Sequence, residues 1–397
     1  MPPGANAGSP RDICPDILAA MDVTRATFAT WNGGRFVNHG ESVDEARWVG
    51  LVRRAHRLGI RTFLTPDVYG CGQADQLLAR GLEGISREDY CLAAAIGHDF
   101  YSGQPRGPKG WPRFTQPGLR RPQDYGDYLL RATEKSLERC RVDRFDLVLL
   151  HNPDSTGFTS EYVWKGLERL REEGLAERLG IAPGPGNGYT LDILECFHRF
   201  QGLIDWVSVI FSPLESWPGS LILRAATHHG VRLMTRMVDA GGILHGDLQP
   251  GHAFGPADLR RQRPAGWLDS SLEKADALRP IASRHGLSLM QLACTWNLQH
   301  AGIESVAPTL SEELGDAARP IEAKLDELAG LPEVRLTDEE FDGIRRIGDN
   351  TGSTPLKGAC LAHEGPPTED SWPVTPGLAE AGARWSIDPA IDLASRS

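Results

Sequence analysis

The 397-residue sequence contains no run of about 18 apolar residues, the length that a helix needs to cross a bilayer. Basic residues are outnumbered, because 42 Lys and Arg stand against 53 Asp and Glu, which gives a formal net charge of −11. This balance disfavours a nucleic-acid-binding protein, which needs a basic face to follow phosphates. Residues 1–15 also lack the apolar core of a signal peptide. We therefore expect a small-molecule partner, not a nucleic acid or a membrane.

The cysteines form no CxxC pair and are odd in number. The seven positions are Cys14, Cys71, Cys91, Cys140, Cys196, Cys294 and Cys360. Such scattered cysteines in a long chain are typical of reduced thiols, so the sequence predicts a cytoplasmic protein. Metal motifs are missing too, since there is neither an HExxH nor a cluster of Cys and His. We expect no metal site.

Short apolar runs alternate with amphipathic stretches from about residue 21 onward. The runs are Ala26–Trp31, Thr62–Leu64, Tyr90–Ile96, Phe145–Leu150, Arg178–Ala182, Trp206–Phe211, Val231–Met234 and Ile303–Ala307. The helical stretches are Val43–Leu58, Gly72–Gly81, Tyr125–Cys140, Ser160–Glu173, Thr190–Phe200, Ser220–His229 and Asp276–His300. This order predicts an α/β protein with a (β/α)8 TIM barrel. Two doubly wound halves are the competing fold, but no GxGxxG follows a first strand.

The composition divides the chain into three parts. Residues 1–20 are rich in Pro, Gly and Ala and predict a flexible tail, and residues 21–348 hold the barrel. Within the barrel, residues 98–123 form a long basic loop after the third strand, where barrel enzymes place active-site residues. This loop is either a solvated surface loop or a lid that recruits an anionic substrate. Residues 349–397 are a Pro-rich extension that either folds over the barrel mouth or trails.

Four segments resemble motifs of the aldo-keto reductase family. Residues 59–70, GIRTFLTPDVYG, are similar to GI-x-x-F-D-T-A-x-x-Y-G, and residues 145–154, FDLVLLHNPD, to D-L-x-x-L-H-x-P-D. Residues 242–244 and 288–296 resemble the family's G-L-L and S-x-x-Q-L-A-x-x-W. The resemblance covers roughly residues 22–348 in the right order. It implies a (β/α)8 barrel that reduces carbonyl compounds with NADPH.

The family reaction moves a hydride to a carbonyl carbon while a tyrosine gives a proton to the oxygen. The resemblance implies that Tyr69 is this acid and that His151 orients the carbonyl. A phenol is a poor acid near neutral pH, so the family places a lysine beside it, held by an aspartate. Leu64 and Ala95 stand at these two positions. The resemblance therefore indicates a divergent member that lacks the catalytic Asp and Lys.

The nucleotide-binding positions differ in the same way. Residues 180–183, GIAP, replace the family's G-V-S-N, and Ser208 and Phe211 replace the Gln and Tyr of the sixth strand. Ser208 and Phe211 are thus the cofactor contacts only if a nucleotide binds. Asp239 would face the pyrophosphate turn, and two acids at 312–313 replace basic residues that hold the 2′-phosphate. We expect no cofactor, with NADPH as the alternative.

Polar residues still follow the predicted strands at the catalytic end of the barrel. The candidate catalytic residues are Tyr69, His151, Asp67, His98, Asp99, Arg236 and Asp239. A histidine at its ordinary pKa serves as a general acid or base, and an arginine anchors a carboxylate or stabilises an enolate. Aspartates such as Asp67 or Asp239 abstract a proton beside a carbonyl.

Three functions remain open. The first is an enzyme that acts on a carbonyl, sugar or lactone-like compound by redox-neutral acid/base chemistry, a lyase or isomerase that dehydrates, epimerises, isomerises or cyclises it. The second is an NADPH-dependent carbonyl oxidoreductase in which His98 or an arginine of the long loop polarises Tyr69. The third is a non-catalytic binding protein. The basic loop favours an anionic ligand, and the oligomeric state is left open.

Overall fold

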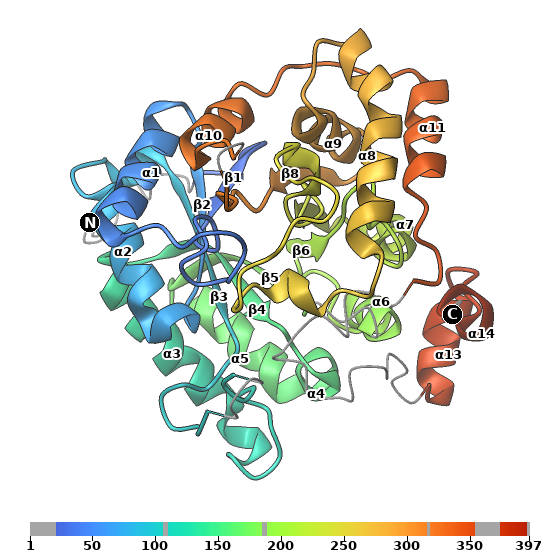
Figure 1. Cartoon of the computed structure of the whole chain (residues 1–397). Helices are drawn as coiled ribbons and strands as arrows, with labels where there is room; N and C mark the ends of the chain where they lie inside the picture. Colours follow the sequence, from blue (N-terminus) through green and yellow to red (C-terminus); the bar gives the residue numbers. More distant parts are fainter. Residues whose placement is uncertain (1–20, 106–109, 185–188, 316–317, 354–373, 395–397) are drawn as a thin grey trace, which may run out of the picture.

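The computed structural model describes residues 21–105, 110–184, 189–315, 318–353 and 374–394, so the predicted N-terminal tail, residues 1–20, lies outside the described residues. Eight parallel strands pair in chain order from β1 to β8, and a backbone bridge between Ala26 and Val306 joins the last strand to the first. Helices surround this sheet (Figure 1). The strands are β1 Thr27–Ala29, β2 Thr62–Pro66, β3 Cys91–Ile96, β4 Phe145–His151, β5 Ala176–Ala182, β6 Trp206–Ile210, β7 Arg232–Arg236 and β8 Ile303–Ala307. The predicted (β/α)8 barrel is confirmed.

Side chains alternate along each strand between the barrel interior and the helix layer, because successive residues of a strand point to opposite faces. In β6, Trp206 lies in the interior cluster, whereas Val207 and Val209 pack against the helices. In β2, Leu64 is interior and Phe63 faces outward. The interior is apolar and rich in small residues, among them the inward alanines of β3. This alternation decides which strand-end residues reach the barrel mouth.

The helices pack their apolar stripes on the outside of the sheet. In α1, for example, Asp44 caps the N-terminus and Trp48, Leu51 and Val52 are buried. No helix in the described ranges combines the length and the hydropathy needed to cross a membrane. The main helices are α1 Glu45–Arg57, α2 Gln73–Leu82, α3 Tyr125–Cys140, α4 Ser155–Thr159, α5 Glu161–Glu172, α6 Thr190–Arg199, α7 Leu223–His228, α8 Trp267–Arg284, α9 Leu289–Leu298, α10 Ile321–Ala329 and α11 Asp338–Gly348.

The predicted single helix Asp276–His300 is wrong, because two helices occupy this region. Helix α8 ends at Arg284, and Gly286 takes the left-handed conformation at φ 64°. Ser288 then starts α9 through a capping box with Gln291. The apolar periodicity continues across the break, which explains why the pattern alone suggests one long helix.

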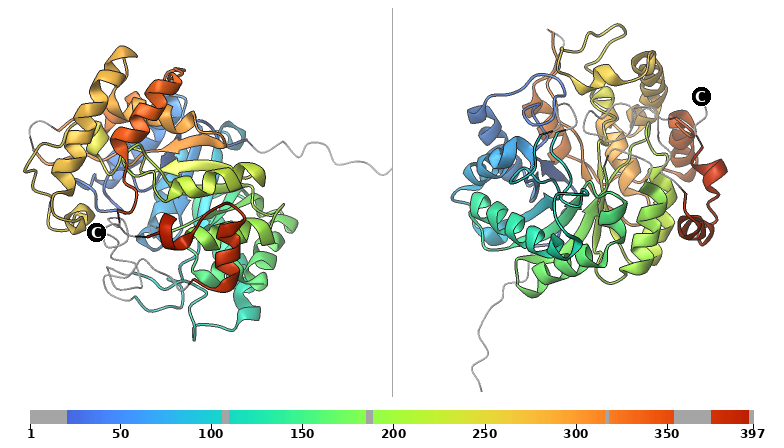
Figure 2. Two further views of the ribbon diagram at one scale, coloured as in Figure 1. Left: turned by 90° about the vertical axis from the view of Figure 1, so that its right-hand side faces the viewer. Right: turned by 90° about the horizontal axis from the view of Figure 1, so that it is seen from below.

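The C-terminal extension contributes two described helices, α13 Pro376–Ala383 and α14 Pro389–Asp392. They lie on the outside of the barrel beside α6 and α7, as Figures 1 and 2 show. The indole Nε1 of Trp217 donates to the carbonyl oxygen of Asp392 at 2.8 Å, which fixes α14 to the loop after β6. These two helices therefore pack against the helix layer.

Candidate functional site

Tyr69 and His151 come together at the carboxyl end of the barrel. His151 is the last residue of β4 and takes an inward position, while Tyr69 opens a 3-10 turn, η1 (Tyr69–Gly72), directly after β2. Gly70 has φ 59° within that turn, and a Cβ there would lie 2.8 Å from the Phe36 ring. Tyr69 packs against the interior cluster, with its ring centroid 6.2 Å from that of His151. The sequence thus folds a phenol and an imidazole onto one side of the mouth.

His98 stands beside His151, with the ring centroids 5.1 Å apart. Its Nδ1 is 2.9 Å from the carbonyl oxygen of Trp111, and its Nε2 is 3.1 Å from the side-chain amide nitrogen of Asn152. These partners assign the proton to Nδ1, because a carbonyl only accepts, and make Nε2 the acceptor. Burial, reinforced by the Arg113 charge, lowers the pKa of His98 to about 4. This imidazole is neutral and fixed at neutral pH.

The pKa of His151 is also held well below its ordinary value. Burial is the main cause, followed by the nearby charges of His98, Arg236 and Arg113. Its Nδ1 is buried and lacks a hydrogen-bond partner within the described residues. His151 is thus a neutral proton acceptor near pH 7, not the group at an ordinary pKa that the sequence alone suggests.

Two guanidinium groups complete the mouth. Arg236 ends β7 at an inward position and donates from Nη2 to the carbonyl oxygen of Pro183. Arg113 comes from the long basic loop, whose backbone pairs His98 with Arg113, and it donates from Nε to the carbonyl oxygen of Asn152. Sequence reasoning described this loop only as basic and did not single out Arg113. Two further cations of the loop, Arg106 and Lys109, lie outside the described residues.

Asp67 and Asp99 do not join this site, contrary to the prediction. Asp67 follows the inward Pro66, so it faces the helix layer, where Asp75 and Arg139 are its charged neighbours. Burial and the Asp75 charge raise the pKa of Asp67 well above its ordinary value. Asp99 accepts from Ser102 and forms an ion pair with Arg120. Asp99 is thus held within its own loop, whereas both carboxyl oxygens of Asp67 lack a hydrogen-bond partner within the described residues.

Asp239 is also not part of the group around His151. Its carboxylate binds two backbone amides in the turn to which the resemblance assigns the pyrophosphate. Its carboxylate accepts from the backbone amides of Gly242 at 2.7 Å and Thr309 at 2.6 Å, and it lies 3.4 Å from Nε2 of His245. Burial opposes ionisation, but the His245 and amide contacts hold the pKa of Asp239 below its ordinary value. A fixed anion therefore occupies the turn to which the resemblance assigns the pyrophosphate.

Residues 246–266, which we call the strap, close the same region. Arg260 of the strap is 3% exposed and forms ion pairs with Asp258 and Glu313, each at 2.7 Å. A Cβ on Gly242 would lie 3.0 Å from both Arg260 and Glu313, so this clamp rests directly on the glycine turn. No local sequence pattern indicates the clamp, since Glu313 is 53 positions from Arg260.

The strap also bridges to the loop after β1. The carboxylate of Asp258 accepts from the amide of Gly40 at 2.9 Å, and the amide of Leu259 donates to the carbonyl oxygen of Asn38 at 2.9 Å. Glu312, the second acid after β8, forms an ion pair with Arg47 of α1. Arg260 and Arg47 and their carboxylate partners in this region thus neutralise one another.

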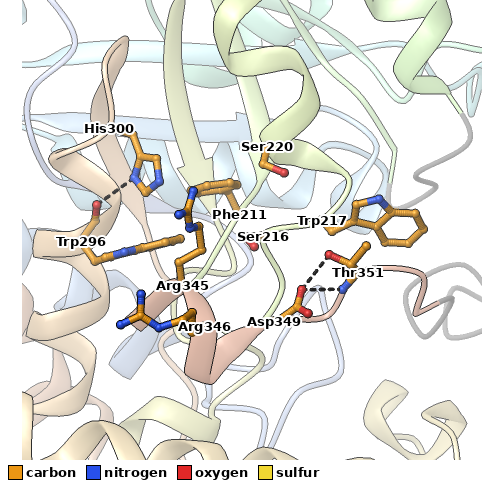
Figure 3. Close-up of a pocket in the computed structure, with 10 residues that line it drawn as sticks. All are labelled: Phe211, Ser216, Trp217, Ser220, Trp296, His300, Arg345, Arg346, Asp349 and Thr351. Atoms are coloured by element: carbon orange, nitrogen blue, oxygen red, sulfur yellow. Dashed lines mark hydrogen bonds between the residues drawn. The ribbon is translucent and has the colours of Figure 1, made fainter. Parts of the chain in front are cut away.

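Phe211 and Ser208, the predicted cofactor contacts if a nucleotide binds, lie on opposite faces of the sheet. Phe211 is buried in the helix layer, where its ring stacks on Trp296 at 5.4 Å and 8° (Figure 3). Ser208 points into the barrel, and its hydroxyl lacks a partner within the described residues. The alternation of β6 explains the difference, because it places positions 207, 209 and 211 outward.

In this structure the groups that the resemblance assigns to NADPH already have protein partners. The amides of Gly242 and Thr309 bind Asp239, the guanidinium of Arg260 pairs with two carboxylates, and the Phe211 ring stacks on Trp296. Within the described ranges, three or more His, Cys, Asp or Glu side chains nowhere gather in a way that could hold a metal ion. The site that remains is the mouth formed by Tyr69, His151, His98, Arg113 and Arg236.

Comparison with known proteins places the chain in a family. The sequence profile described as "Aldo/keto reductase family" matches residues 30–349. A probable voltage-gated potassium channel subunit beta from Oryza sativa subsp. japonica is 25% identical over 74% of this chain and 86% of its own length. The D-threo-aldose 1-dehydrogenase of a Pseudomonas species is 25% identical over 66% of this chain and 78% of its own.

Solved structures share the fold. The glycerol dehydrogenase AKR11B4 of Gluconobacter oxydans superposes with a TM-score of 0.64 at 19% identity, over 83% of this chain and 93% of its own. An aldo-keto reductase of Klebsiella pneumoniae, solved in complex with NADPH, gives 0.55 at 18% identity, over 84% and 94%. With the profile match spanning most of the sequence, the barrel and its strand-end site identify this chain as a member of the aldo/keto reductase family.

Proposed function

We propose that this family member is an enzyme of redox-neutral acid/base chemistry that acts on an anionic, oxygenated small molecule. The observation that carries the proposal is the set of contacts around the turn at residues 239–242, where Asp239 holds the amides of Gly242 and Thr309 and Arg260 is clamped by Asp258 and Glu313. Removing these groups for a dinucleotide would leave buried charges unpaired, which is unfavourable. A reaction without a hydride donor avoids this penalty.

The residues at the positions of the family's catalytic Asp and Lys also support the proposal. Leu64 and Ala95 are 2% and 1% exposed and lie in the apolar interior against which Tyr69 packs. An alkyl environment does not lower the pKa of a phenol in the way that a lysine does. We infer that this member lacks the catalytic Asp and Lys, so that Tyr69 gives up its proton only to a strongly basic group such as a departing hydroxide.

The charge of the mouth supports an anionic substrate. Arg113 and Arg236 both lie close enough to depress the pKa of His151, whereas Asp67 and Asp99 lie outside the mouth and Asp239 is paired. Guanidinium groups bind carboxylates with paired, charge-assisted hydrogen bonds. We infer a carboxylate-bearing carbonyl, sugar or lactone-like compound as substrate. The acidic net charge and the free thiols among the described cysteines support a small-molecule partner and a cytoplasmic location.

A dehydration illustrates how the protons balance. The neutral His151 imidazole takes the proton from the carbon beside the carbonyl, and the Tyr69 hydroxyl gives its proton to the departing hydroxyl group, which leaves as water. The His151 imidazolium then returns its proton to the Tyr69 phenolate, so no electrons are gained or lost. Arg236 stabilises the enolate formed between these two steps. Epimerisation or isomerisation uses the same groups, with the proton returned to carbon.

An NADPH-dependent carbonyl oxidoreductase is the second candidate. It is favoured by the name of the Pseudomonas relative, an aldose dehydrogenase, and by the Klebsiella structure solved with NADPH. It requires the strap to open and release Arg260 from Asp258 and Glu313. A binding protein without catalysis is the third candidate, and it requires only that the mouth accept a ligand.

A nucleotide titration separates the first two candidates. We expect no change in NADPH fluorescence up to about 1 mM, the upper end of ordinary Michaelis constants. Saturable micromolar binding would overturn the redox-neutral proposal in favour of the oxidoreductase. Arg260→Ala is the matched variant. If the ion pairs of Arg260 alone exclude the nucleotide, this variant should bind NADPH more tightly than the parent.

Turnover separates the enzyme from the binding protein. A panel of hydroxy and keto carboxylates is incubated without nucleotide and followed by NMR for loss of water or exchange of the carbon-bound proton. We expect Tyr69→Phe and His151→Gln each to lower turnover by about 10²-fold or more, the usual contribution of a positioned acid or base. Ligand binding with identical product formation in both variants would exclude the proposed roles.

A further inference from the structure

A pocket lies far from the barrel mouth, on the outer surface near the C-terminus. Its volume is about 340 Å³, and it lies where α6 and α7 meet the residues that follow α13. Figure 1 shows these three helices side by side at the edge of the molecule. Its lining is His198, Arg224, His228, His229, Arg384 and Trp385. Five of these six side chains carry basic nitrogen.

Few carboxylates border this pocket. Arg384 pairs with the carboxylate of Glu195 at 3.1 Å. Within the described residues, the structure records no acidic partner for Arg224, His198, His228 or His229. On a protein with a net charge of −11, carboxylates to neutralise such a cluster are abundant. A basic cluster left without them, in a concave site, is what an anion-binding pocket requires.

Several of these groups surround the indole ring of Trp385. The rings of His228 and His229 lie 5.3 Å and 5.9 Å from it, and the Arg224 guanidinium carbon lies 5.9 Å from its centroid. The two imidazoles are themselves 5.0 Å apart. Burial, followed by the charges of His228 and His198, lowers the pKa of His229. The basic groups of the cluster therefore lie close together around one ring, where a single anion can contact several of them.

We propose that this pocket binds a phosphoryl group, carried either by a phosphate ester or by free phosphate. Arg224 and Arg384 offer forked N–H donors to a tetrahedral oxyanion, and the neighbouring imidazoles add further donors. The ligand bridges the barrel, through α6 and α7, to the C-terminal segment, through Arg384 and Trp385. Occupancy therefore stabilises the docked C-terminal helices. The site is separate from the mouth and independent of the reaction proposed there.

Calorimetry on the full chain tests the proposal, with inorganic phosphate, sulfate and phenyl phosphate as probes at constant ionic strength. We expect phosphate and sulfate to bind with dissociation constants below about 5 mM. Tighter binding of phenyl phosphate would identify an ester as the ligand, and equal or weaker binding would identify free phosphate. Both outcomes support a phosphoryl site, whereas no saturable binding of any probe would overturn it.

Substitutions show whether sulfate binds in this pocket. Arg224 and His228 are exposed, so Arg224→Gln and His228→Asn leave the fold intact. We expect each to weaken sulfate binding about tenfold, the value of one charge-assisted hydrogen bond. Arg279→Gln is the matched control, since Arg279 is exposed and pairs with Asp276 on α8. Equal losses in the control and in Arg224→Gln would mean diffuse surface attraction and would refute the pocket.

The link between the barrel and the C-terminal segment provides a separate readout. Hydrogen exchange of residues 376–392 should slow when sulfate is bound, and unchanged exchange would contradict the bridging role.

Discussion

The protonation state of His151 governs the chemistry of the barrel mouth at the scale of single residues. Burial and three cationic or imidazole neighbours keep the pKa of this side chain well below 6.5. The imidazole is therefore neutral and able to accept a proton throughout the neutral range. An unburied histidine at the same sequence position would be half protonated near pH 6.5 and could act as an acid.

Removing one neighbouring charge should raise this pKa. In Arg236→Gln, a guanidinium that disfavours the imidazolium is lost, so we expect the pKa of His151 to rise. The acid limb of any pH–activity profile should move upward with it. NMR titration of the imidazole checks the change, with Arg279→Gln as control. A fall in pKa would show that Arg236 does not lie close to His151 in solution.

Asp67 leads to a second pH prediction, this time for stability. The pKa of this buried carboxyl is raised well above 3.8, so the folded protein retains a proton that the unfolded chain loses. Stability is therefore lost as the pH rises from about 4 through the folded pKa. Asp67→Asn removes this loss. We expect the variant to be more stable than the parent near pH 8, by about 1.4 kcal/mol for each pH unit that separates the folded pKa from the unfolded one.

Urea unfolding at about pH 5 and pH 8 measures this effect. The difference between Asp67→Asn and the parent should grow with pH. Asp143→Asn is the control, because Asp143 is exposed and should change stability equally little at both values. A variant that is less stable than the parent at the higher pH would mean that Asp67 is ionised and usefully paired in the folded protein.

At the scale of elements, the strap determines whether a nucleotide can bind beside Gly242. Its Arg260 lies between Asp258 and Glu313, all three almost fully buried. Breaking a buried ion pair by removing one partner typically costs about 3–5 kcal/mol, because the other charge is left unpaired. We expect Arg260→Leu to lower the free energy of unfolding by about this amount.

Denaturant unfolding checks the strap prediction. The triple variant Arg260→Leu, Asp258→Asn, Glu313→Gln should recover part of the loss, since the buried charges of the clamp are then gone. Arg279→Leu removes an exposed arginine and should stay within about 0.5 kcal/mol of the parent. If Arg260→Leu is as stable as the parent, Arg260 does not form its buried ion pairs with Asp258 and Glu313 in solution.

The whole molecule is a barrel with a C-terminal segment fastened to its outside. Ala381 and Ile387 are buried there, and Trp217 donates to the carbonyl oxygen of Asp392. Deleting residues 374–397 should leave the barrel folded but less stable by about 1–3 kcal/mol, the burial of one or two aliphatic side chains. Circular dichroism during heating measures this change.

The same deletion should leave the mouth unaffected, because α13 and α14 pack beside α6 and α7. Any activity that depends on Tyr69 and His151 should therefore persist in the shortened protein, whereas phosphate binding at the outer pocket should be lost. Loss of both together would mean that the C-terminal segment supports the barrel as a whole.

The sequence by itself determined the barrel and the place of its strand-end residues. Period-two apolar runs and period-3.6 stretches are local patterns, and a residue such as His151 stands at the end of a clearly apolar run. Tyr69 followed by Gly70 likewise marks a turn at a strand end. Local periodicity of this kind survives in the folded protein because each element packs through its own apolar face.

Only the tertiary structure decided which of these residues share a site. Asp67 and Tyr69 are two positions apart, yet one faces the helix layer and the other the mouth. The clamp of Arg260 on Glu313 and the depressed pKa of His151 depend on groups far away in the chain. Burial and long-range charge pairing arise only when the barrel closes, and no local pattern in the sequence encodes them.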